Sequence, residues 1–137
     1  MRWALVLAFV LALSLPAFGG ARGGADVRAI RALLHKQLTL VQQGKFRQLY
    51  ALTTAALRRR CPYARFVRGA REVRRAIGPN SNVDRILVDF KANRRAVVQY
   101  RFLKNRKPFI RVRFSDGDLY TKLGTRWYDE YDAVTCS

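Results

Sequence analysis

The chain is short of the residues that build most metal centres and nucleophilic active sites. Its 137 residues include one histidine, His35, and two cysteines, Cys61 and Cys136, with no Cys-x-x-Cys pair. A zinc site needs several cysteine and histidine ligands, and a catalytic nucleophile needs a base beside it. His35 has no such partner and is interpreted as a surface or boundary residue beside an apolar helix stripe. We therefore expect no metal site and no cofactor.

Acidic residues are also scarce. Nine Asp and Glu face 27 Lys and Arg, which gives a formal net charge of +18. Most of the basic residues are arginines, which stay charged at every physiological pH and bind phosphates and carboxylates through forked hydrogen bonds. A protein this basic is expected to adhere to polyanions. The alternative is that the charge is merely tolerated and reflects a genome rich in G and C.

Long hydrophobic runs are absent apart from one near the start. Residues 3–15 form an apolar run that ends at Pro16, and this run is shorter than the roughly 20 residues that a membrane-spanning helix needs. Arg2 precedes the run and several small residues follow it. This order is typical of a secretory signal peptide, which we predict over residues 1–21. A retained signal anchor is the alternative.

Export determines the expected organisation of the rest of the chain. We predict cleavage after Gly19 or Ala21, a flexible lead-in over residues 22–25, and one domain over residues 26–137, because this length suits a single domain. The protein would then be secreted or extracytoplasmic in the cell envelope, and only the signal segment would meet the membrane.

Export to an oxidising compartment predicts a structural role for the two cysteines. An even pair in an oxidising environment usually forms a disulfide. A Cys61–Cys136 bridge would close a long loop and contribute roughly 4 kcal/mol in the loop-entropy treatment. A redox pair or a metal site is the functional alternative, but neither has the neighbours it needs.

Hydrophobic periodicity divides the domain into two halves. Apolar residues recur at three- and four-residue spacing in the first half and predict three helices. The first runs from Asp26, which can cap it, to Gly44, and the others cover residues 45–60 and 62–77. A cluster of Gly, Pro, Asn and Ser at residues 78–82 ends this half with a turn.

From residue 85 onward the hydrophobic period changes to two, which predicts a four-stranded antiparallel meander. Asp116-Gly117-Asp118 is either a turn or a bulge inside one long strand. Asp89 is expected to point outward and to meet an arginine. No Asp or Glu occupies an inward position. The inward positions that the pattern assigns are Ile86, Val88, Phe90, Val98, Tyr100, Phe102, Ile110, Val112, Phe114 and Trp127.

Helices followed by a meander make an α+β domain, with N-terminal helices packed on a curved four-stranded antiparallel sheet. Gly44-Lys45-Phe46, Leu49-Tyr50 and the closing strand over residues 124–129 resemble the nuclear-transport-factor-two-like superfamily, the cystatin-like cone shared with polyketide-cyclase-like proteins. The resemblance covers about residues 26–133 and suggests a secreted bacterial member. It implies a curved sheet around a helix, often with a pocket at the mouth of the cone, and no fixed chemistry.

The resemblance leaves both catalysis and binding open. Isomerase-like members use a carboxylate base together with a tyrosine or acid donor inside the cone, and a buried base with a shifted pKa is the feature to look for. The predicted inward positions contain no carboxylate, so we identify no catalytic residue. The candidate pocket for a small apolar ligand consists of Tyr50, Phe66, Tyr100 and Trp127.

Two charged clusters are further candidates. The acidic cluster over residues 129–132 has oxygen ligands that suit calcium, but ion pairing with arginines is the favoured interpretation. The densest basic stretch can hold anions, with a solvated helix face as the plain alternative. The candidate anion patch in this stretch consists of Arg58, Arg59, Arg60, Arg65 and Arg68.

These observations predict a secreted, small, basic domain that works as a non-enzymatic binding or accessory module. It would contact an anionic envelope surface, a partner protein or a small apolar ligand. The alternative is an isomerase- or cyclase-type enzyme that acts on a small hydrophobic substrate in the cone pocket. Polyanions are the expected partners, no motif for specific nucleic acid is visible, and a homodimer is left open.

Overall fold

The computed structural model describes residues 20–92, 94–104, 107–110, 118–131 and 136. Within this part of the chain, α1 (Gly20–Gln42), α2 (Phe46–Ala51), α3 (Ala55–Arg60) and α4 (Tyr63–Ile77) precede the strands. The strands are β1 (Ser81–Lys91), β2 (Arg95–Lys104), β3 (Lys107–Ile110), β4 (Asp118–Leu123) and β5 (Arg126–Tyr131). The predicted α+β class, with N-terminal helices against an antiparallel sheet, is confirmed.

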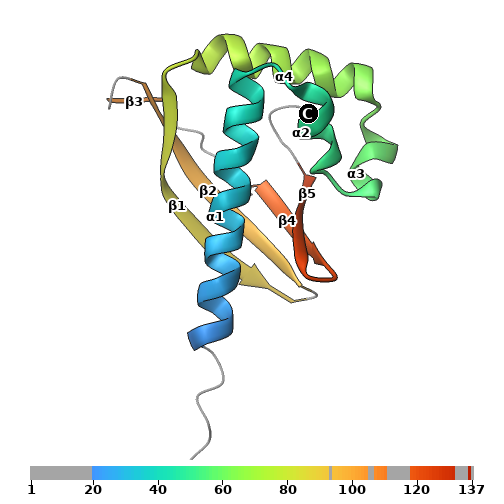
Figure 1. Cartoon of the computed structure of the whole chain (residues 1–137), viewed down its shortest axis with the longest axis vertical. Helices are drawn as coiled ribbons and strands as arrows, with labels where there is room; N and C mark the ends of the chain where they lie inside the picture. Colours follow the sequence, from blue (N-terminus) through green and yellow to red (C-terminus); the bar gives the residue numbers. More distant parts are fainter. Residues whose placement is uncertain (1–19, 93, 105–106, 111–117, 132–135, 137) are drawn as a thin grey trace, which may run out of the picture.

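The long helix α1 runs along the long axis of the molecule. In Figure 1, α1 lies across the sheet, α4 crosses the molecule near the C-terminal end of α1, and the β4–β5 hairpin lies toward its N-terminal end. The first residue of α1, Gly20, and the whole of α4 therefore lie at opposite ends of the molecule. No helix in the described part of the chain is long and apolar enough to cross a membrane.

The start of α1 differs from the sequence-based expectation. The helix already begins at Gly20, so residues 22–25, expected to be a lead-in, are helical. Asp26 does not cap the helix because it lies inside it. Its Oδ1 atom instead accepts hydrogen bonds from Lys122 Nζ at 2.8 Å and from Trp127 Nε1 at 3.0 Å. Asp26 therefore ties α1 to β4 and β5.

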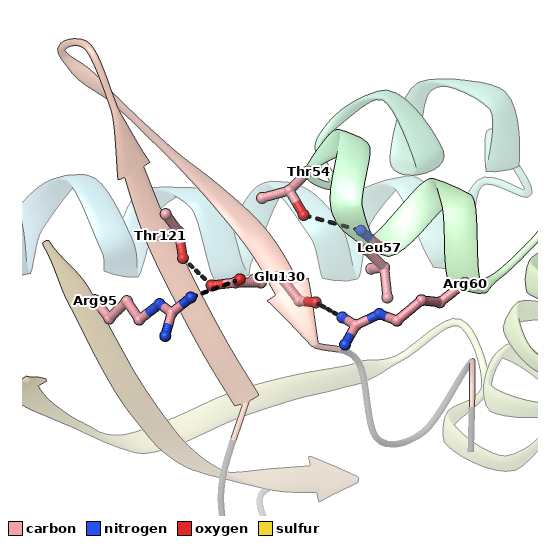
Figure 2. Close-up of polar contacts among 6 residues, drawn as sticks. All are labelled: Thr54, Leu57, Arg60, Arg95, Thr121 and Glu130. Carbon is pink, nitrogen blue, oxygen red and sulfur yellow. Dashed lines mark hydrogen bonds and ion pairs between the residues drawn. The ribbon is translucent and has the colours of Figure 1, made fainter. Parts of the chain in front are cut away.

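The single helix predicted over residues 45–60 is two short helices. The break falls at Thr53 and Thr54, where Thr54 N donates to Asp129 O at 2.8 Å and Asp129 N donates to Leu52 O at 3.0 Å. Thr54 then caps α3, since its side-chain oxygen accepts a hydrogen bond from Leu57 N at 3.1 Å (Figure 2). Backbone pairing with a distant strand thus overrides the local helical pattern.

The sheet has the order β1-β2-β4-β5, and every pair in it is antiparallel. The short strand β3 also pairs with β2, beside Phe102, while β4 pairs with β2 beside Val98. The predicted turn or bulge at Asp116 and the inward positions Val112 and Phe114 lie outside the described residues. The sheet is not strongly curled.

A bulge in β1 changes which side chains face the helices. The register of β1 on β2 shifts between Asp84 and Leu87, where Arg85 has a positive φ of 47°. Ile86 is buried, as expected, and Leu87 is 64% exposed. Phe90, predicted to point inward, is 42% exposed and pairs with Ala96 next to the turn between β1 and β2. Its ring lies 6.1 Å from that of Trp127.

One apolar core joins the helices to the sheet, and one covalent link joins its two halves. Core side chains such as Ile30, Phe66 and Val98 are at most 1% exposed. The predicted disulfide is confirmed: Cys61 bonds to Cys136, and their Cα atoms lie 6.0 Å apart. Because Cys61 lies between α3 and α4, the bridge attaches the end of the chain to the helical layer.

Candidate functional site

The outer face of α4 carries five exposed arginines, at positions 65, 68, 71, 74 and 75. This helix packs Phe66, Val67, Ala70 and Ile77 into the core. Arginines at the intervening positions face solvent because the apolar and basic residues repeat with the helical period. A groove of about 600 Å³ runs beside this face, and its lining residues are Phe46, Arg68, Arg71, Glu72, Arg74 and Arg75.

Arg74 has a structural role in this groove. Its Nε atom donates to Gln42 O at 3.0 Å and so binds a carbonyl at the C-terminal end of α1. Gly44 ends that helix with a φ of 69°, and a Cβ there would come within 3.1 Å of Arg74 Nη1. The glycine therefore provides both the left-handed backbone and the space for the guanidinium.

The other three arginines of the groove are available for binding. Arg68, Arg71 and Arg75 are exposed, and none of them forms a hydrogen bond or ion pair with another described residue. Glu72 is the one acidic side chain in the groove lining. Like charges held on one helix face raise the local positive potential, so this face attracts anions.

The structure does not gather the five arginines of the predicted anion patch. Arg58 donates a hydrogen bond to Thr53 O, and Arg60 Nη2 donates to Glu130 O at 2.9 Å (Figure 2). Both guanidinium groups therefore bind backbone carbonyls. Arg59 and Arg65 are exposed, and Arg68 alone of the five lines the groove. The arginines that accompany Arg68 come from the later turns of α4.

A buried polar network crosses the interface between α1 and the sheet. Gln37 Nε2 donates to Asp129 Oδ2 at 3.0 Å, and Tyr120 Oη donates to Gln37 Oε1 at 2.5 Å. Asp129 is 1% exposed and Tyr120 is 0% exposed. The expectation that no carboxylate faces inward is therefore wrong, and the acidic cluster of the sequence is divided between the two faces of β5.

The sequence carried a signal for this inward carboxylate. The alternation predicts Trp127 on the inner face, and residues two apart on a strand share a face, so Asp129 belongs there as well. Its surroundings suit a structural role, because the carboxylate is enclosed and accepts a hydrogen bond from Gln37. Buried polar groups with partners stabilise a specific packing arrangement, here of α1 on β4 and β5.

The other carboxylates in the strand half of the chain do not join this buried network. Asp89 points outward, as expected, but its ion-pair partner is Lys91 rather than an arginine. Asp116 lies outside the described residues. On the outer face of the sheet, Arg101 donates two hydrogen bonds to Asp84, at 2.9 and 2.6 Å, and these bonds lower the pKa of Asp84.

The four residues of the predicted pocket fall into separate groups. Tyr50 and Phe66 meet in the helical layer with ring centroids 5.0 Å apart, and Tyr50 Oη donates to Cys61 O at 2.8 Å. Tyr100 lies 5.4 Å from the ring of Phe102 on β2, and Trp127 bonds to Asp26. Among the described residues, no ring contact joins the first pair to Tyr100 or Trp127.

The predicted acidic cluster does not come together as a cation site. Glu130 lies on the face of β5 opposite to Asp129, where its carboxylate bonds to Arg95 at 3.1 Å and to Thr121 (Figure 2). Asp132 lies outside the described residues. Over the described ranges, no group of three or more His, Cys, Asp or Glu is placed to hold a metal ion. His35 is exposed on α1.

The contacts of Asp26 with β4 and β5 lower its pKa. The hydrogen bond from Lys122 lowers the pKa of Asp26 most, and the bond from Trp127 lowers it further, against an opposing effect of burial. The charged carboxylate therefore fastens α1 to the β4–β5 hairpin at neutral pH.

Comparisons of the chain with protein-family models, with curated proteins and with solved structures find no match. The two structural features that bear on function are the exposed arginines of α4 and the enclosed carboxylate of Asp129.

Proposed function

We propose that this chain is an exported, non-enzymatic binding module that contacts an anionic surface outside the cytoplasm. The observation that carries the proposal is uncompensated positive charge. The sequence has 27 basic and nine acidic residues, and four ion pairs join the described residues to one another. Several arginines bind backbone carbonyls, but Arg68, Arg71 and Arg75 face solvent and have no partner among the described residues.

The enclosed state of Asp129 supports binding rather than catalysis. A general base must come within hydrogen-bond reach of the proton it removes, and Asp129 is 1% exposed and bonded to Gln37. The exposed arginines of α4, by contrast, can reach an anionic partner without any rearrangement of the core.

The order of helices and strands also supports membership of the cone-shaped nuclear-transport-factor-two-like superfamily, which we include in the proposal. An N-terminal helix that lies across an antiparallel sheet agrees with the arrangement that the resemblance implies.

Export is the part of the proposal that depends on the N-terminal signal peptide. The Cys61–Cys136 disulfide supports it, since stable disulfides persist in oxidising compartments. We expect a secreting host to release the protein with a new N-terminus after Gly19 or Ala21. N-terminal sequencing of the released chain measures this directly, and an intact Met1 on a membrane-bound product would contradict cleavage.

Polyanion binding is tested by retention on immobilised heparin. We expect the oxidised chain to stay bound at physiological ionic strength and to elute at higher salt, because contacts between arginine and anions are screened by salt. Elution at or below about 0.15 M salt would contradict the proposed function. A neutral agarose column controls for contacts with the matrix.

A further inference from the structure

The three available arginines of α4 form a row along the helix. Arg68, Arg71 and Arg75 are spaced three and four residues apart, so their Cα atoms rise by about 4.5 and 6 Å along the axis. All three are exposed, and they line the same groove. A row of cations about 10 Å long suits a ligand that carries several anionic groups in sequence better than a single small ion.

The chemistry of the row favours phosphate. A guanidinium offers two parallel N–H donors that match two oxygens of one phosphate, and such charge-assisted pairs are stronger than neutral hydrogen bonds. Arg74 is already held by Gln42 O and keeps its positive charge in the groove wall. Successive phosphates on one chain would therefore meet successive guanidinium groups.

The shape of this face favours a linear polymer over a lipid bilayer. A helix that lies on a membrane inserts large apolar side chains between the headgroups. The exposed large hydrophobic residues of the described chain are Leu87, Phe90 and Leu123, and none belongs to α4. In Figure 1 the turn of the β4–β5 hairpin, which follows Leu123, points away from α4.

We propose that the row of Arg68, Arg71 and Arg75 on α4 is a binding site for linear polymers that carry phosphate groups. This inference rests on the proposed function, because it assigns that anionic contact to one helix face and to one ligand chemistry. Phosphodiester wall polymers, released nucleic acid and inorganic polyphosphate share this chemistry. Recognition is by charge and spacing, so it is blind to bases and sugars.

The experiment measures binding of fluorescein-labelled inorganic polyphosphate of about 15 phosphates to the oxidised chain by fluorescence anisotropy at several salt concentrations. The variant R68Q/R71Q/R75Q is compared with R28Q/K36Q/R126Q, which loses the same charge at exposed sites on α1 and β5. We expect the α4 variant to bind about 30- to 100-fold more weakly and the control about threefold more weakly. The slope of log affinity against log salt should fall by about two in the α4 variant.

The outcomes separate this inference from the function on which it rests. If the wild-type chain binds neither polyphosphate nor heparin, the proposed function fails. If it binds polyphosphate but both triple variants weaken equally, the charge acts as a whole and the α4 site is overturned. Circular dichroism confirms folding of the variants, which is expected because glutamine is a good helix former.

Competition with the wild-type chain tests the ligand class independently of any variant. Unlabelled polyphosphate and a double-stranded DNA fragment should both displace the probe, whereas orthophosphate should require concentrations at least about 100-fold higher per phosphate. Hyaluronan, which carries carboxylates, and vesicles rich in phosphatidylglycerol should compete weakly. A stronger effect of hyaluronan or vesicles than of polyphosphate would overturn the inference.

Discussion

The contact between α1 and β5 and the outer face of α4 use polar side chains in opposite ways. At the first, Gln37, Tyr120 and Asp129 are buried and joined by hydrogen bonds. At the second, Arg68 and Arg71 face solvent without a described partner. The first region therefore stabilises the fold, and the second remains free to bind. Substitutions should separate these two roles.

Loss of the disulfide should have the largest effect, and it should act on stability alone. The double variant C61S/C136S loses a link between positions 75 residues apart, so we expect the free energy of unfolding to fall by about 4 kcal/mol. Urea denaturation followed by circular dichroism measures the change. A loss below about 1 kcal/mol would show that the helical layer holds the chain end without the bridge.

The buried network gives the next largest effect. Asp129→Ala leaves the Gln37 amide without its carboxylate partner in the interior, so we expect a loss of about 2–4 kcal/mol in unfolding free energy. Tyr120→Phe removes one hydroxyl from the same network and should cost about 1 kcal/mol. Both are measured by urea denaturation. Polyphosphate affinity below the transition should not change, and a parallel loss of affinity would break the comparison between the two regions.

Two exposed arginines, one inside the groove and one outside it, test whether binding depends on the groove. Arg71 lines the groove and Arg59 lies outside it on α3, although both are exposed. We expect Arg71→Gln to weaken polyphosphate binding about fivefold and Arg59→Gln less than twofold, with stability within about 0.5 kcal/mol of wild type in both. Anisotropy titrations measure the difference. Equal effects would show that the binding site is not confined to the groove and includes the basic stretch around Arg59 that the sequence suggested.

The smallest effect concerns pH and Asp26. Because its folded-state pKa is lowered, mainly by the hydrogen bond from Lys122, its stabilisation is present above the usual pKa of 3.8. It is lost as the pH falls through the lower, folded-state pKa. Asp26→Asn should therefore reduce stability at pH 7 by less than about 1 kcal/mol and match wild type near pH 2. Thermal melts at both values test this, and an equal difference at both pH values would contradict the ionic role.

The sequence predicted the features that depend on short-range patterns. The change of hydrophobic period after residue 82 indicated the α+β order, and the even cysteine pair indicated the bridge that the structure confirms. The break at Thr53 was missed because it depends on backbone pairing with Asp129, far along the chain. A local periodic pattern contains no information about such a partner.

The candidate site was harder to predict for the same reason. Every arginine in a basic stretch looks alike in the sequence, but Arg58 and Arg60 bind carbonyls that only the folded chain brings near them. The inward position of Asp129 was within reach, since it follows Trp127 by two residues on one strand. The whole acidic cluster was expected to form ion pairs with arginines, so this alternation was not applied to Asp129.

The length of α1 sets the distance between an attachment at the start of this helix and a contact made by α4. The helix has 23 residues, which corresponds to about 34 Å, and α4 crosses near its far end. A chain held at its first residues would hold α4 and its arginine row roughly that distance above the surface of attachment. α1 then acts as a spacer, so that a tethered molecule could bridge two surfaces, whereas a released one would bind only polymers it meets in solution.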